Sequence, residues 1–152
     1  MKVLHIFTTI MCILLLVACN NQNNSSSIQD DSSDIVMLSS DTSNEHEENS
    51  IPSIAQTYLD DQTNDIATYK AIHIEDQLFV AFNATPLKQA VEQKIEKKVK
   101  KDLETLTNIK DIHVTSDQKF YIELTKLENQ QLSKDKVLKK LKELKKLSKE
   151  QT

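Results

Sequence analysis

The chain has no glycine, no arginine and no tryptophan. Glycine accepts positive φ and lets the backbone approach a ligand closely, so phosphate-cradling loops, nucleophile elbows and Rossmann-type turns depend on it. A chain without glycine lacks those loops, which excludes nucleotide-dependent chemistry by these routes. Because arginine is missing too, the basic side chains are lysines.

An apolar segment at the N-terminus has the features of an export signal. Residues 3–17 follow a single lysine and are fewer than the roughly 20 apolar residues of a membrane span. The segment closes on Leu16-Val17-Ala18-Cys19, a lipobox-like sequence with a small residue before the cysteine. We predict a signal peptide over residues 1–18, cut between Ala18 and Cys19. The alternative is a plain secretory signal cut nearby, with Cys19 as a spectator.

Cysteine is otherwise scarce, since the only other one, Cys12, lies in the segment to be removed. Acylation of Cys19 would leave no free thiol in the mature chain, so neither a disulfide nor a thiolate metal site could form. A diacylglyceryl group adds fatty acyl chains such as palmitate, and two chains anchor a protein stably where one is marginal. We therefore expect the mature protein on the extracytoplasmic side of the cell membrane, held by lipid at Cys19.

Residues 19–50 are rich in Asn, Ser, Gln and acidic side chains, and they contain no lysine. Such a composition buries too little apolar surface to offset the entropy of ordering, so we predict a disordered acidic linker. One apolar patch, Ile35-Val36-Met37-Leu38, interrupts it. We interpret this patch as an accidental apolar island, with a docking spot as the alternative.

Patterning typical of a folded domain covers residues 51–131. Ser50 as N-cap and Pro52 in the first turn predict a helix over 51–61. Two apolar runs with a short connection predict a β-hairpin, whose strands and turn are residues 67–74, 78–82 and 75–77.

A long helix is then expected from Pro86, with Thr85 as its N-cap. Its apolar stripe recurs at helical spacing and consists of Leu87, Val91, Ile95, Val99, Leu103 and Leu106. The remaining patterns predict one more strand and two more helices, at residues 109–115, 119–130 and 134–149. The expected fold is α+β: a small three-stranded, antiparallel-type sheet with helices on one face, in the order α-β-β-α-β-α.

The combination of lipobox, acidic Asn/Ser-rich linker, hairpin and Lys-rich helix resembles the YhcN/YlaJ family of sporulation lipoproteins. The segments that carry the resemblance are Ala71–Ile74, Leu78–Phe82, Ile95–Val99 and Ile109–Asp117, within residues 54–131. Members usually carry glycine in the hairpin turn, where this chain has Glu75-Asp76-Gln77, so the match is to a divergent member. The resemblance implies a low-GC Gram-positive spore former, a location at the forespore or spore inner membrane, and an influence on germination or outgrowth. It implies no catalytic residues.

Several titratable residues are candidates for a metal site or for catalysis. His73 and His113 lie on predicted strands and could share a metal ion with Glu75 or Asp117, although strand histidines usually have structural roles. Ser116 next to His113 and Asp117, or the pair Asp60 and Asp61, could suggest a hydrolase. Neighbours in sequence rarely converge on one substrate atom, so we predict no enzyme, no metal and no cofactor.

Residues 132–152 are predicted to form a separate basic, amphipathic helical tail. Its candidate contact residues, for membrane or partner, are Lys139, Lys140, Lys142, Lys145 and Lys146. The default interpretation is a solvated helix face. The alternatives are an interfacial helix on anionic lipid and a site for an anionic wall polymer or a partner helix of another spore-envelope protein. Nucleic acid is not expected as a partner outside the membrane, and no aromatic residues interleave these lysines for base stacking.

The sequence thus predicts a membrane-anchored, non-catalytic structural or binding module of the spore envelope. One alternative is an extracytoplasmic lipoprotein unrelated to spores, of ligand-binding or immunity type. The other is a small cell-wall hydrolase.

Overall fold

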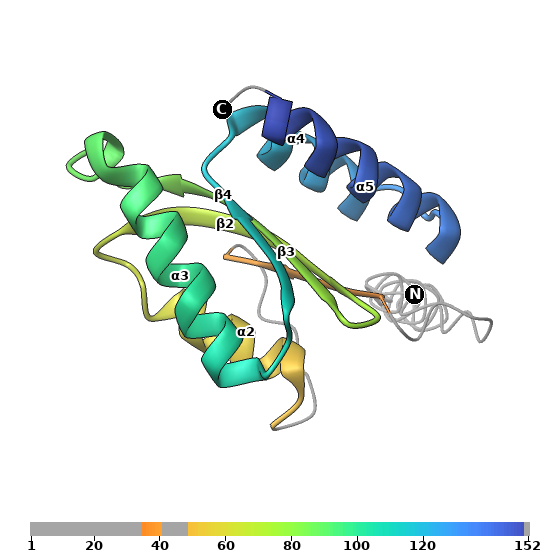
Figure 1. Cartoon of the computed structure of the whole chain (residues 1–152), viewed down its shortest axis with the longest axis horizontal. Helices are drawn as coiled ribbons and strands as arrows, with labels where there is room; N and C mark the ends of the chain where they lie inside the picture. The colour runs from red at the N-terminus through yellow and green to blue at the C-terminus, as the bar shows by residue number, and fades with distance from the viewer. Residues whose placement is uncertain (1–34, 41–48, 151–152) are drawn as a thin grey trace, which may run out of the picture.

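The computed structural model describes residues 35–40 and 49–150. They form a four-stranded sheet in the order β1-β2-β3-β4, with helices on both of its faces (Figure 1). The elements, in chain order, are β1 (Ile35–Ser39), α2 (Ile51–Asp60), β2 (Ile66–Ile74), β3 (Gln77–Ala84), the 3-10 helix η1 (Gln89–Val91), α3 (Glu92–Thr107), β4 (Asp111–Thr115), α4 (Gln118–Glu128) and α5 (Lys134–Glu150). The α+β class is confirmed.

The expected three-stranded sheet is wrong, because the apolar patch in the acidic segment is the edge strand β1. It pairs antiparallel with β2, with Leu38 opposite Ala71, and Leu38 is buried. Five residues would not hold a strand alone, but β2 offers both backbone partners and an apolar surface. The part of the predicted linker that lies at 20–34 and 41–48 is outside the described residues.

The antiparallel expectation is also wrong for the last strand. β2 and β3 form the predicted hairpin, whereas β3 and β4 run parallel, with Val80 opposite Val114. A parallel pair needs a long crossover, and α3 supplies it. The sheet is therefore mixed, and the β3-α3-β4 unit fixes where α3 lies.

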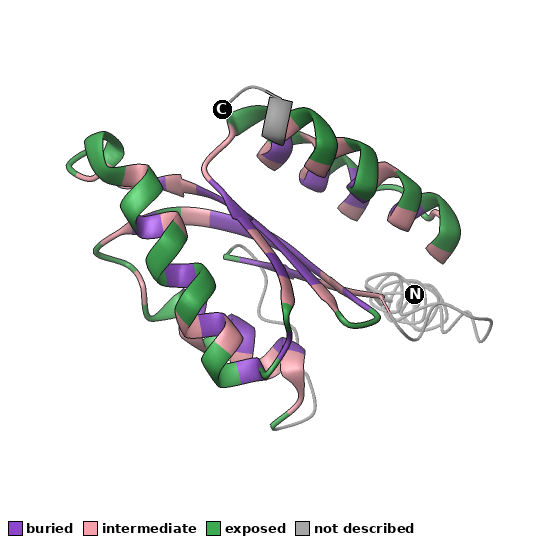
Figure 2. Ribbon diagram, in the orientation of Figure 1, coloured by how far each residue is buried: buried purple, intermediate pink, exposed green. Residues whose placement is uncertain are grey.

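The core lies in two layers, one on each face of the sheet (Figure 2). On one face, α2 and α3 cover buried strand residues that include Tyr69 and Phe82. On the other face, α4 and α5 cover a second apolar cluster that includes Ile72 and Phe79. Helices on a single face were expected, so this too is corrected. Alternate strand residues point to opposite faces, and both sets are apolar here, which requires cover on both sides.

The segment predicted as a separate tail forms α5 and takes part in this second layer. Val137 is 1% exposed and Leu141 is fully buried. Both belong to the same apolar cluster as Phe120 and Leu124 of α4. The apolar stripe of α5 from Val137 to Leu144 is therefore held against the domain, and the opposite, largely charged side of the helix faces solvent.

The helix expected from Pro86 begins only at Glu92. Residues 85–91 form tight turns, with the Lys88 amide bonded to the Thr85 carbonyl and the Val91 amide bonded to the Lys88 carbonyl. Leu87 is consequently 93% exposed, and Val91 and Leu106 are exposed as well. The apolar stripe of α3 is therefore Ile95, Val99 and Leu103.

Without glycine, the described chain places other residues at positive φ. These are Asn49, Glu75 and Asn108. Asn108 ends α3 in the left-handed conformation, which asparagine tolerates better than most residues. Glu75 opens the two-residue turn between β2 and β3, at a φ of 54°. Glutamate has no such tolerance, so this turn carries backbone strain.

Candidate contact surface

The predicted lipidation site lies outside the described residues. Ala18 and Cys19 belong to residues 1–34, of which the structure gives no placement. The signal peptide, its cleavage and the lipid on Cys19 therefore stay predictions from sequence.

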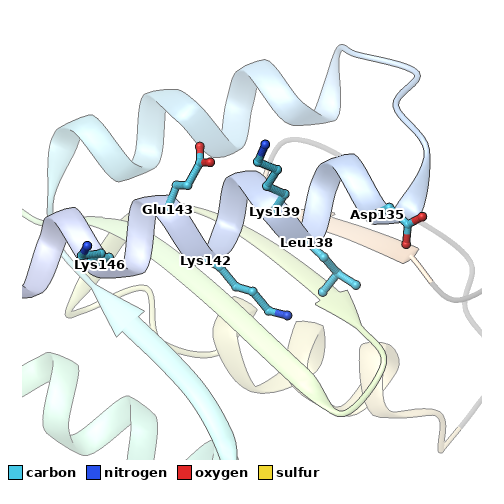
Figure 3. A pocket seen from close by; sticks show the side chains of 6 residues that line it. All are labelled: Asp135, Leu138, Lys139, Lys142, Glu143 and Lys146. Carbon is cyan, nitrogen blue, oxygen red and sulfur yellow. The ribbon is translucent and has the colours of Figure 1, made fainter.

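Three of the five candidate lysines lie on the outer side of α5. Lys139, Lys142 and Lys146 are exposed, and their spacing places them on one helical face, away from Val137 and Leu141. With three further residues they line a shallow, solvent-open hollow: Asp135, Leu138 and Glu143 (Figure 3). All six side chains come from one helix, so the hollow does not enclose a small molecule. We call Lys139, Lys142 and Lys146 the lysine row.

The other two candidate lysines are engaged within the protein. Lys140 is half-buried and donates to the Gln130 Oε1 atom at 3.0 Å. Lys145 is half-buried and pairs with Asp111 at the start of β4, while its Nζ atom lies 5.8 Å from the centre of the Phe79 ring. These two lysines fasten α5 to the rest of the domain.

The ion pair with Lys145 sets the charge state of Asp111. The hydrogen bond from Lys145 holds the pKa of the Asp111 carboxyl below its ordinary value, against a smaller opposing effect of burial. Gln77 adds a second hydrogen bond, from its Nε2 atom to the Asp111 Oδ2 atom at 2.7 Å. Asp111 is thus a charged anchor for α5.

A second charged pair joins the sheet to α4. Lys70, in the middle of β2, has a side chain only 10% exposed and lies 2.9 Å from the Glu128 carboxylate. Sequence reasoning did not single out either residue. The available signal was a lysine inside a long apolar strand, since a buried lysine needs a counter-charge.

His73 and His113 cannot form the two-histidine metal site considered from sequence. His73 pairs with Leu78, which belongs to the layer under α2 and α3. His113 pairs with Phe79 and stacks near Phe120, in the layer under α4 and α5. Paired residues on adjacent strands point to the same face, so the two imidazoles lie on opposite faces of the sheet. Among the described residues, no group of three potential ligands could hold a metal ion.

The residues considered for hydrolysis have structural partners. Ser116 donates its hydroxyl to the Glu96 carboxylate at 2.8 Å. Asp117 is the N-cap of α4 and accepts the Lys119 and Phe120 amides. His113 lies in the aromatic contacts described above. The three are neighbours in sequence, but the hydroxyl of Ser116 and the carboxylate of Asp117 bond to other parts of the fold.

The adjacent carboxylates at the end of α2 have different surroundings. Asp60 accepts the hydroxyl of the buried Tyr69 at 2.6 Å, whereas Asp61 is the C-cap residue of α2. Burial, with a hydrogen bond to Asp60, raises the pKa of Tyr69 above its ordinary value. Nearby, burial and a hydrogen bond to Asp102 raise the pKa of Tyr58. Both phenols stay protonated and tie α2 to the sheet and to α3.

No protein-family model, curated protein or solved structure matches this chain. The resemblance to the YhcN/YlaJ family therefore rests on the sequence segments quoted above. Within the part that the structure describes, no helix has the length and hydrophobicity to cross a bilayer.

Proposed function

We propose that the protein is a lipid-anchored, non-catalytic binding or structural module on the outer side of the cell membrane. The observation that carries this proposal is the order of features in the chain. A lipobox-like sequence ends at Cys19, and the first strand of a folded domain follows at Ile35. The domain presents a row of exposed lysines on α5 and buries an apolar core on each face of its sheet.

The distance between anchor and domain supports a role close to the membrane. Only residues 20–34 separate Cys19 from β1. At about 3.3–3.6 Å per residue, this segment spans at most about 54 Å in any conformation. The linker expected from sequence, up to residue 50, would have reached about twice as far. A lipid at Cys19 would therefore keep the domain near the lipid surface.

The engaged state of the candidate catalytic residues favours binding over hydrolysis. Ser116 is hydrogen-bonded to Glu96, and Asp117 caps the N-terminus of α4. A hydrolase needs a nucleophile, a base and an orienting group that converge on one site, and these residues serve the fold instead.

The spore location is the part of the proposal that comes from the family resemblance. On that basis the protein is a component of the spore envelope, at the forespore or spore inner membrane, and influences germination or outgrowth. The alternative location is the membrane of growing cells, as a lipoprotein unrelated to spores.

Fractionation through a sporulation time course tests both parts. We expect the protein in the membrane fraction of purified spores and not in vegetative membranes. We expect Cys19→Ser to move it out of the membrane, and the matched control Cys12→Ser to leave it there. Equal amounts in vegetative membranes would contradict the spore assignment. A membrane-bound Cys19→Ser variant would contradict the anchor.

A further inference from the structure

We propose that the lysine row of α5 contacts the anionic phospholipid surface into which the lipid anchor inserts. The α5 side of the domain then faces the membrane. This inference rests on the proposed lipid anchor and adds which face meets the membrane and what chemistry it recognises. Lys139, Lys142 and Lys146 are the contact residues, and Lys136 is an exposed neighbour on the same helix.

The place where the anchor segment joins the domain favours this face. Ile35 is the first residue of β1, and its side chain packs against the apolar cluster under α4 and α5. Ile35 is opposite Ile74, which is followed by Glu75, and Glu75 pairs with Lys134 at the start of α5 at 3.3 Å. The first residue of β1, to which the anchor segment is joined, thus lies at the end of the sheet next to the first turn of α5.

Electrostatic forces set the orientation of the domain once the anchor holds it at the membrane surface. The tip nearest the entry point carries two exposed acidic residues. Glu75 is paired with Lys134, which leaves Asp76 as the charge that an anionic surface repels. The lysine row shares its face with Asp135 and Glu143, and with Lys136 nearby the face still carries a net positive charge that attracts the same surface. The helix α5 is about 25 Å long, well within reach of the segment. Repulsion at the tip and attraction along the helix together turn the domain onto α5.

The opposite layer provides a matched control. Lys94, Lys97 and Lys101 are exposed on α3, which covers the other face of the sheet. They carry the same charge as the lysine row but lie away from the entry side. If position and not total charge sets the contact, the membrane covers the lysine row and leaves the three α3 lysines accessible to solvent.

Chemical labelling of the lipidated full chain in vesicles tests the inference. An amine-reactive, membrane-impermeant reagent would be applied to protein in phosphatidylglycerol-containing and in purely zwitterionic vesicles, and mass spectrometry would read each lysine. We expect labelling of the lysine row to be roughly fivefold slower on anionic than on zwitterionic vesicles. The difference should disappear in 1 M salt, where the screening length falls to about 3 Å. The α3 trio should label equally in both.

A variant pair sharpens the result. Changing Lys139, Lys142 and Lys146 together to Gln should abolish the salt-sensitive protection of Lys136, whereas the same change at Lys94, Lys97 and Lys101 should preserve it. Equal labelling of the lysine row on both vesicles would overturn the inference. So would protection of the α3 trio, or protection that appears only with an added anionic wall polymer.

Flotation with zwitterionic vesicles reports on the anchor separately. Its loss would overturn the anchor and the inference that rests on it, while flotation without protection would overturn the docking alone.

Discussion

Lys145, near the end of α5, donates a hydrogen bond to Asp111, the first residue of β4 and 34 positions earlier in the chain. This contact joins the last helix to the strand at the far edge of the sheet from β1. It makes α5 a part of the domain, and it divides the lysines of α5 into an anchoring set and an outward-facing set.

The Asp111 pair predicts how stability depends on pH. The folded-state pKa of Asp111 is lowered from 3.8, so its contribution is present above the unfolded value and is lost as pH falls through the folded value. Asp111→Asn should lower the free energy of unfolding at pH 7 by about 0.5–1 kcal/mol, since the pair is partly exposed. The difference from the parent should shrink on acidification below about pH 4. Urea unfolding at several pH values measures it, and Asp76→Asn, on the exposed turn, serves as control. A difference that stayed constant down to pH 2 would contradict the assignment.

The burial of α5 predicts a large cost for shortening its inner side chains. Leu141 is fully buried and Leu147 is 45% exposed. Leu141→Ala should lower the free energy of unfolding by about 2–4 kcal/mol, whereas Leu147→Ala should lower it by less than about 1 kcal/mol. Chemical unfolding followed by circular dichroism gives both values. Equal and small effects would mean that α5 is a detached tail.

The edge strand β1 predicts that the domain begins before residue 51. Leu38 is 1% exposed in the layer under α2 and α3. Leu38→Ala should cost about 2–4 kcal/mol of unfolding free energy, because it leaves a cavity there. Leu87→Ala, at a side chain 93% exposed, is the matched control and should change stability by less than about 0.5 kcal/mol. If Leu38→Ala were as mild as the control, β1 would not belong to the fold.

The β2–β3 turn predicts a stabilising glycine in a chain that has none. Glu75 holds a φ of 54°, which costs a residue with a Cβ atom about 1–2 kcal/mol that glycine does not lose. Glu75→Gly should therefore raise the free energy of unfolding by a net of about 0.5 kcal/mol, after the entropy of the unfolded chain and the loss of an exposed ion pair with Lys134. Asp76→Gly, at ordinary φ, should lower stability. Thermal unfolding of the two variants and the parent measures these changes. A loss of stability in both variants would contradict the backbone strain at Glu75.

Much of the fold could be predicted because its signals are local. The cap at Ser50, the hairpin between Ile66 and Ala84, and the 3.6-residue periods of α4 and α5 all depend on neighbours within a few residues. The strand β1 could not be found this way. Its five residues are held by β2, which lies beyond α2, and the surrounding composition is that of a linker.

The candidate surface was only partly predictable for a similar reason. The lysines of α5 were visible as a group, but which of them face the sheet depends on how the helix rotates over it. Lys145 lies four residues after Leu141, and that spacing was the one local sign of an inward position. The placement of His73 and His113 on opposite faces required the register of three strands, which no local pattern gives.

Metabolic labelling with a radioactive fatty acid tests the central claim most directly. In cells that express the full chain, label should enter the parent protein and the Cys12→Ala variant equally and should be absent from Cys19→Ala. A Cys19→Ala variant that is labelled as strongly as the parent would contradict the account.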